Sequence, residues 1–136
     1  MKGAQSLIRI STHQVETLQK RLAALVDVRM AAEMKLVMLH AEAEAENAHV
    51  SDDAQAGFHR LAFLRGWRIR RDSALADIEA ATTEEAGARD ALSRAFEELK
   101  KFEHVAELAR LAEIKEAARR ETAALDEMGL RIAQAR

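Results

Sequence analysis

The chain has 136 residues, of which 4% are aromatic and 32% charged, and it contains no proline, no cysteine and only five glycines. This composition is typical of long helices and coiled coils and not of a globule with a large core. The net charge of −2 argues against bulk electrostatic binding to nucleic acid or an anionic membrane, and the lack of cysteine excludes disulfides and thiol chemistry.

The first predicted element is a long helix over residues 5–48. Its apolar seam returns every three or four positions, which is the pattern of helices that wind around one another. Ser11 and Thr12 are candidate caps, and Leu7 and Ile8 allow an earlier start. The seam consists of Val15, Leu18, Leu22, Leu25, Arg29, Ala32, Leu36, Leu39, Ala43, Glu46 and Val50.

A single reversal is predicted at residues 49–54. Asn47, Ser51, Asp52, Asp53 and Gly57 form the only cluster of turn and capping residues in the chain. Ser51 or Asp52 is the expected cap of the second helix.

The second predicted helix covers residues 55–133. Thr82–Gly87 is a weak point, but one glycine costs only about 1 kcal/mol, so a continuous helix is favoured. The fold class is therefore all-α, a long antiparallel two-helix coiled-coil hairpin with a longer second helix, forming one rod-like domain over residues 1–136. The second seam consists of Leu61, Leu64, Arg68, Arg71, Leu75, Ile78, Thr82, Glu85, Arg89, Leu92, Phe96 and Leu99.

The two helices are unequal in length, which leaves part of the second without a partner. If the helices pair from the turn outward, the first helix ends at the level of Phe96 to Glu103 of the second. About 35–40 residues remain, or about 50–60 Å of helix. Their apolar positions, displaced by one residue from the earlier frame, are Leu111, Ile114, Ala118, Glu121, Leu125, Met128 and Ile132. A lone stripe of this kind needs to be buried, either by self-association or by another protein.

The residues beside the turn carry opposite charges and most of the large aromatic side chains. Acidic residues dominate positions 41–53, and Arg60, Arg65, Arg68, Arg70 and Arg71 follow within twelve positions. One interpretation is that these charges select the pairing register. The other makes the arginines, with Phe58, Phe63 and Trp67, a surface for a partner, unless Met34 and Met38 cover the aromatic rings.

Two registers of the hairpin are compatible with the sequence. Pairing Leu39 with Leu61 matches apolar layers best but sets Arg29 beside Arg71. Pairing Glu46 with Leu61 avoids that clash and buries more charge.

No pattern of catalytic, cofactor-binding or metal-binding residues emerges from the sequence. Glu46 and His49 have the spacing of a di-iron ligand pair, but the second such pair that the site requires is missing. Phosphate-binding loops and nucleophile motifs are absent as well. No segment has the roughly 18 apolar residues of a membrane span, and residues 1–10 do not form a signal peptide. We expect a soluble cytoplasmic protein that is not an enzyme.

The hairpin with its acidic turn and its aromatic and arginine-rich second helix resembles the FliJ family of flagellar type III export proteins. The resemblance covers nearly the whole chain. It is carried by Val15–Leu22, Phe63–Asp72 and Ala88–Lys101, with Arg119–Glu121 and Asp126–Glu127.

The resemblance implies a stalk without catalytic activity, bound at the inner-membrane export apparatus. Such a stalk inserts into the hexameric export ATPase, contacts the membrane-embedded export gate and helps to cycle export chaperones. By region, it assigns the gate side to Phe58, Phe63, Trp67, Arg65, Arg68 and Arg70. It assigns the ATPase side to Leu111, Ile114, Leu125, Met128 and Ile132.

Other functions stay open at this point. An injectisome stalk would have the same pattern, and a homo-oligomeric scaffold or adaptor would bury the tail against a second copy. A stalk is expected to be a monomer outside its complex. A peripheral membrane or nucleic-acid binder using Arg60–Arg71 is disfavoured because the neighbouring acidic block neutralises much of the field.

Overall fold

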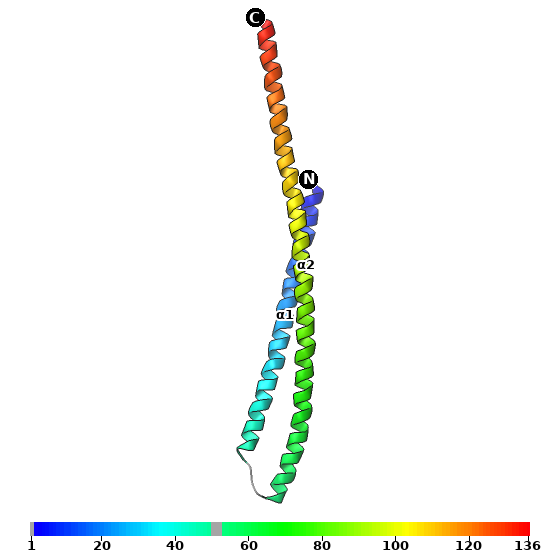
Figure 1. The fold of residues 1–136 in the computed structure, drawn as a ribbon, viewed down its shortest axis with the longest axis vertical. Helices are drawn as coiled ribbons and strands as arrows, with labels where there is room; N and C mark the ends of the chain where they lie inside the picture. Colours follow the sequence, from blue (N-terminus) through cyan, green and yellow to red (C-terminus); the bar gives the residue numbers. More distant parts are fainter. Residues whose placement is uncertain (1, 50–52) are drawn as a thin grey trace. The chain divides into compact units, whose positions relative to one another are not determined.

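The fold consists of two helices joined by one short connection. The computed structural model describes residues 2–49 and 53–136. Within them the chain forms α1 (Lys2–Asn47) and α2 (Ala54–Ala135), without any strand (Figure 1). The predicted all-α fold with a longer second helix is confirmed.

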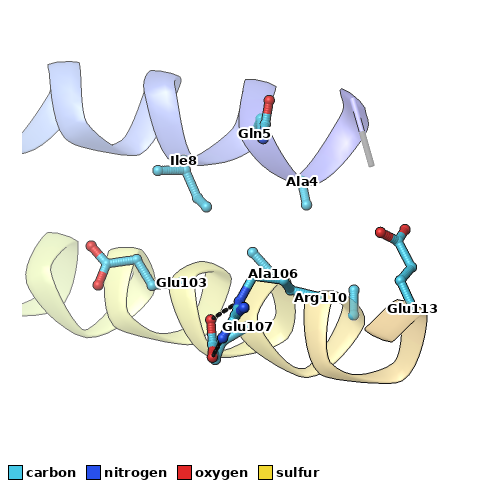
Figure 2. A pocket seen from close by; sticks show the side chains of 9 residues that line it. Ala4, Gln5, Ile8, Glu103, Ala106, Glu107, Arg110 and Glu113 are labelled. Atoms are coloured by element: carbon cyan, nitrogen blue, oxygen red, sulfur yellow. Dashed lines mark hydrogen bonds and ion pairs between the residues drawn. The ribbon is translucent and has the colours of Figure 1, made fainter. Parts of the chain in front are cut away.

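The contacts divide the chain into two compact units, each containing a stretch of both helices. The turn unit is Glu16–Ser93, and the terminal unit comprises the residues up to Val15 together with Arg94–Arg136. In the turn unit, Asn47 contacts Arg60 and Arg29 contacts Glu85, so the helices run antiparallel. The terminal unit is antiparallel too, with Ile8 beside Ala106 and Ala4 further along, beside Arg110 (Figure 2).

The helix ends follow from local hydrogen bonding. α1 starts near the N-terminus and passes through Thr12, whose hydroxyl donates to the carbonyl of Ile8 at 2.8 Å inside the helix. At the start of α2, the carboxylate of Asp53 accepts a hydrogen bond from the backbone N–H of Gln55 at 3.3 Å. Asp53 therefore has the role of a cap. The expected caps Ser51 and Asp52, like the seam position Val50, lie outside the described residues.

The weak point predicted around Thr82 does not interrupt α2, which runs continuously through Gly87. The hydroxyls of Thr82 and Thr83 donate to the carbonyls of Ile78 and Glu79, four residues earlier in the helix. Both hydroxyls are thereby satisfied by the helix itself, as is usual for threonine in a helix interior.

The seam of α1 is confirmed at every described position. Val15 and Leu39 are buried, and the other members as far as Glu46 are half-buried. This seam was readable because leucines dominate it and because the polar members fall on the same three-and-four spacing.

The seam of α2 was predicted correctly at alternate positions only. Leu64, Arg71, Ile78, Glu85, Leu92 and Leu99 are buried or half-buried as expected. The intervening positions were wrong by one residue: Leu61, Arg68, Leu75, Thr82, Arg89 and Phe96 are exposed. The residues one position earlier take their place in the seam: Trp67 is half-buried, and Ala74, Ala81, Ala88 and Ala95 are buried. Alanines pack here because a small side chain lets the helix backbones approach closely. A prediction that favours the larger residue at each position therefore places the seam one residue too late.

The observed register differs from the predicted alternative that matches apolar layers best. Pairing Leu39 with Leu61 is wrong, because the Leu39 carbonyl accepts a hydrogen bond from Trp67. The second alternative, Glu46 with Leu61, fits the contact between Asn47 and Arg60 beside the turn. It does not fit the pairs of Glu42 with Arg70 and of Arg29 with Glu85, which set α2 five to seven residues further along against α1. The clash of Arg29 with Arg71 does not arise.

Replacing Leu39, which is 3% exposed, by alanine removes a large side chain from the seam. We expect Leu39→Ala to lower the free energy of unfolding by about 2–5 kcal/mol. The neighbouring Met38 is 60% exposed, so Met38→Ala is the matched control and should change it by less than about 0.5 kcal/mol. Thermal and urea unfolding followed by circular dichroism measure both, and equal losses would contradict the assigned seam.

Candidate interaction surfaces

Trp67 joins the two helices of the turn unit. Its indole Nε1–H donates to the backbone carbonyl of Leu39, and its ring meets that of His40 edge-on, with 5.7 Å between centroids. The guanidinium of Arg71 lies 5.4 Å from the indole centroid, within cation–π range. Trp67 is half-buried, as is Phe63. Two of the three aromatic residues assigned to the gate side thus belong partly to the hairpin's own packing.

Phe58 is the aromatic residue of this region that faces solvent. It is 74% exposed, and Ile69, on the same side of α2, is 71% exposed. Ala62 and Arg65 lie between them at helical spacing, and both are exposed. We name this strip, Phe58, Ala62, Arg65 and Ile69, the outer strip of α2. The alternative that methionines shield the aromatic region is wrong, because Met34 and Met38 are themselves exposed.

The arginines near the turn divide between internal pairing and the surface. Arg70 forms an ion pair with Glu42 of α1 at 2.9 Å, and Arg60 donates to Asn47. Arg65 and Arg68 are exposed, and no ion pair is found for either among the described residues. Arg70 and Arg60 thus link α1 to α2. That the exposed Arg65 and Arg68 bind a partner stays a prediction.

α1 carries a second apolar face, which the seam does not indicate. Met30, Met34, Val37 and Met38 are all more than half exposed and follow one another at helical spacing. At 100° per residue they lie opposite the seam, and Ala41 and Ala45 continue the same face. We call this the methionine face. The helical spacing of this face is visible in the sequence, but methionines at that spacing are equally compatible with a cover over the aromatic rings.

In the terminal unit, α2 extends past the beginning of α1 (Figure 1). Ala4 lines the same groove as Arg110 and Glu113, so α1 accompanies α2 to about this point. The paired part of α2 is therefore longer than expected, because α1 starts at Lys2 and the pairing is shifted toward the C-terminus of α2. Every residue from 117 to 136 is exposed.

The five residues assigned to the ATPase side are exposed apolar side chains of the C-terminal part of α2. Leu111, Ile114, Leu125, Met128 and Ile132 are each about half exposed or more. We call them, with Ala118, the tail stripe. The expectation that the C-terminal end of α2 presents an apolar stripe without a cover from α1 is confirmed.

The tail stripe is not a continuation of the hairpin seam. The seam ends with Phe102, Ala106 and Ala109, and the next positions in its frame are the charged residues Glu113, Glu116 and Arg120. The tail stripe is offset from this frame by one or two residues, or roughly 130° around the helix. A longer α1 would thus meet charges, while the apolar side of the tail faces another direction.

The groove between the helices of the terminal unit is lined by three alanines, one isoleucine and five polar or charged side chains. Ala4 and Ile8 of α1 lie across it from Ala106 (Figure 2). The Arg110 guanidinium donates to Glu107 at 2.6 and 3.0 Å, and this bond lowers the pKa of the Glu107 carboxyl. Among the described residues, no group of three potential metal ligands is found, and neither helix is long and apolar enough to cross a membrane.

These features define a class, the α-helical hairpin proteins whose candidate sites are exposed apolar surfaces. A family model described as Flagellar FliJ protein matches residues 1–136. The chain is 52% identical over 130 residues to the Flagellar FliJ protein of Caulobacter vibrioides strain NA1000 / CB15N, covering 96% of this chain and 94% of that protein. The same protein of strain ATCC 19089 / CIP 103742 / CB 15 gives the same values. No solved structure gives a significant match. The chain belongs to the FliJ family of flagellar type III export proteins.

The indole hydrogen bond can be tested by Trp67→Phe, which keeps an aromatic ring but removes the donor. We expect the free energy of unfolding to fall by about 1 kcal/mol or more, since the ring also becomes smaller. Phe58→Ala, at an exposed position, should leave it within about 0.5 kcal/mol. Urea unfolding followed by circular dichroism compares them, and a larger loss for Phe58→Ala would refute the packing role of Trp67.

Proposed function

We propose that this protein is a stalk without enzymatic activity that couples the flagellar export ATPase ring to the export gate and helps to cycle export chaperones. The family membership supports the setting, and the uncovered tail stripe of α2 is the observation that carries the proposal. A helix with an exposed apolar side gains stability when a partner buries it. We further propose a place in the cytoplasm, at the inner-membrane export apparatus.

The ATPase side of the proposed stalk is the tail stripe. Leu125, Met128 and Ile132 offer large flexible or branched side chains on one side of the helix, and their exposure leaves them available to a ring interior. The segment beyond Glu113 has about 23 residues, or about 35 Å of helix.

The gate side of the proposed stalk is the surface of the turn unit. Phe58, Arg65 and Arg68 are exposed there, whereas Arg70 is shared with Glu42. Phe63 and Trp67 are half-buried and would support the surface from beneath. The methionine face of α1 adds apolar area in the same unit, and exposed Met, Phe and Arg are residue types enriched in protein interfaces.

A homo-oligomeric scaffold is the second candidate, because two tail stripes could cover each other. The two functions differ in the state of the free protein. A stalk that awaits a ring is a monomer at tens of micromolar, whereas a scaffold forms dimers or larger assemblies at that concentration.

The ATPase side is tested by Leu125→Lys combined with Ile132→Lys. We expect this variant to bind the export ATPase hexamer at least about tenfold more weakly, because two buried apolar anchors become charges. The matched control is Ala123→Lys combined with Gln134→Lys, which adds the same charge to the opposite side of the helix. Isothermal titration calorimetry gives the affinities, and equal binding by both variants would contradict the assignment.

Sedimentation equilibrium on the same two variants tests the scaffold. If the parent protein forms oligomers that Leu125→Lys with Ile132→Lys dissolves and the control does not, the tail pairs with itself and the stalk proposal fails.

The gate side is tested by Phe58→Ser combined with Ile69→Ser on the outer strip of α2. We expect pull-down by the export gate's cytoplasmic part to fall about tenfold, while the circular dichroism spectrum stays helical. Val28→Ser combined with Leu75→Ser removes exposed apolar area elsewhere in the turn unit and serves as the control. Normal gate binding by a folded Phe58→Ser, Ile69→Ser protein would exclude this surface.

A further inference from the structure

A buried carboxylate occupies the middle of the seam in the turn unit. Glu85 is 6% exposed, and both of its oxygens are used. Oε2 accepts from Arg29 Nε of α1 at 2.5 Å, and Oε1 accepts from Arg89 of α2 at 2.8 Å. Arg29 also donates to Glu33 at 2.9 Å, one helical turn further along α1. These bonds lower the pKa of Glu85, through Arg89 first and Arg29 second, and raise that of Arg29.

The apolar residues around this pair do not define which parts of the two helices face each other. Ala74, Ala81 and Ala88 are buried and recur every seven residues along α2. If α1 slid by one heptad, each alanine layer would be replaced by another alanine layer. The connection of six residues between α1 and α2 can extend to about 20 Å, which exceeds the roughly 10 Å of a slide by one heptad, so its length alone does not forbid the slide.

The intervening positions of the α2 seam do differ from one another. Ile78, Glu85 and Leu92 follow at intervals of seven, so a slide by one heptad in either direction would place Arg29 against an isoleucine or a leucine. The guanidinium would lose its buried acceptor, and Glu85 would face an apolar part of α1. Arg29 would keep only Glu33, and Glu85 would keep only Arg89, each on its own helix. The charge-assisted hydrogen bond between the helices would be lost at a buried carboxylate, which is unfavourable.

We propose that the pair of Arg29 and Glu85 selects the register of α1 against α2. In this role the pair excludes the slid arrangements that the repeated alanines permit, which is the function best established for single polar residues in coiled-coil seams. The proposal does not depend on the identity of the protein's partners. The register also determines which part of the methionine face lies level with the outer strip of α2.

The absence of native cysteine allows a direct test by disulfide trapping. Ala32 and Ala81 line the same groove between the helices, so Ala32→Cys with Ala81→Cys reports the observed register. Ala32→Cys with Ala74→Cys, or with Ala88→Cys, reports a slide by one heptad. Each pair is equilibrated in a glutathione redox buffer and quantified by mass spectrometry, first with Arg29 and Glu85 intact and then with Arg29→Leu and Glu85→Leu.

With the ion pair intact, we expect disulfides to form at position 81 and only in traces at 74 and 88. With both leucines, we expect a yield at 74 or 88 within about threefold of that at 81, because the registers become nearly equal in free energy. Glu42→Leu with Arg70→Leu removes an exposed ion pair of the same composition and should keep disulfides at 81. Cross-linking at 81 alone in the Arg29→Leu, Glu85→Leu protein would overturn the proposal.

A second variant covers the case in which the double leucine protein loses its helicity. Glu85→Gln keeps the size of the side chain and one acceptor oxygen, but it removes the charge and replaces the second acceptor by an NH2 donor. We expect this variant, checked by circular dichroism, to raise the yield at 74 or 88 at least about threefold over the parent protein. A folded Glu85→Gln protein with the parent's cross-linking pattern would equally overturn the proposal.

Discussion

The packing of α1 against α2 along a narrow seam is the interaction on which the rest of the structure depends. The chain has few large aromatic residues, and its buried and half-buried seam positions are occupied largely by leucines of α1 and alanines of α2. Alanine contributes little apolar area by itself, but it permits close contact between helix backbones and the dispersion attraction that comes with it. A seam this narrow leaves most of each helix surface to solvent. The exposed apolar faces of the turn unit and the terminal unit are a direct result.

The helical fold, the position of the turn and the inequality of the helices could be predicted from the sequence because each has a strong local cause. The absence of proline leaves long helices uninterrupted, and the polar cluster before Gly57 is the one place where a reversal is favoured. The seam of α1 was equally legible, because leucine spacing marks it clearly. The seam of α2 was predicted correctly at alternate positions only. The pattern favoured the large residues Leu75 and Phe96, whereas the alanines one residue before them are buried. Periodicity alone does not decide between a large residue and a small one when both fit the spacing.

The interaction surfaces could be located by region but not in detail. The tail stripe was predictable because the number of residues in α2 exceeds what α1 can cover. Near the turn, the sequence indicated candidate residues but not which of them pack within the hairpin and which face solvent. Trp67 packs against α1 while Phe58 faces solvent, and this difference depends on the register, which two sequence alternatives left open. The methionine face could not be predicted from the sequence because methionine is suited both to cores and to adaptable surfaces.

The offset between the tail stripe and the hairpin seam separates two kinds of contact on one helix. In the terminal unit, the side of α2 that touches α1 ends in charged residues, and the side left for other molecules lies more than a third of a turn away. A ligand engaging the latter side has no need to displace α1, so capture and release would proceed without opening the intramolecular pairing. Docking of this kind avoids an unfolding penalty and permits rapid exchange of binding partners while the same fold is retained throughout.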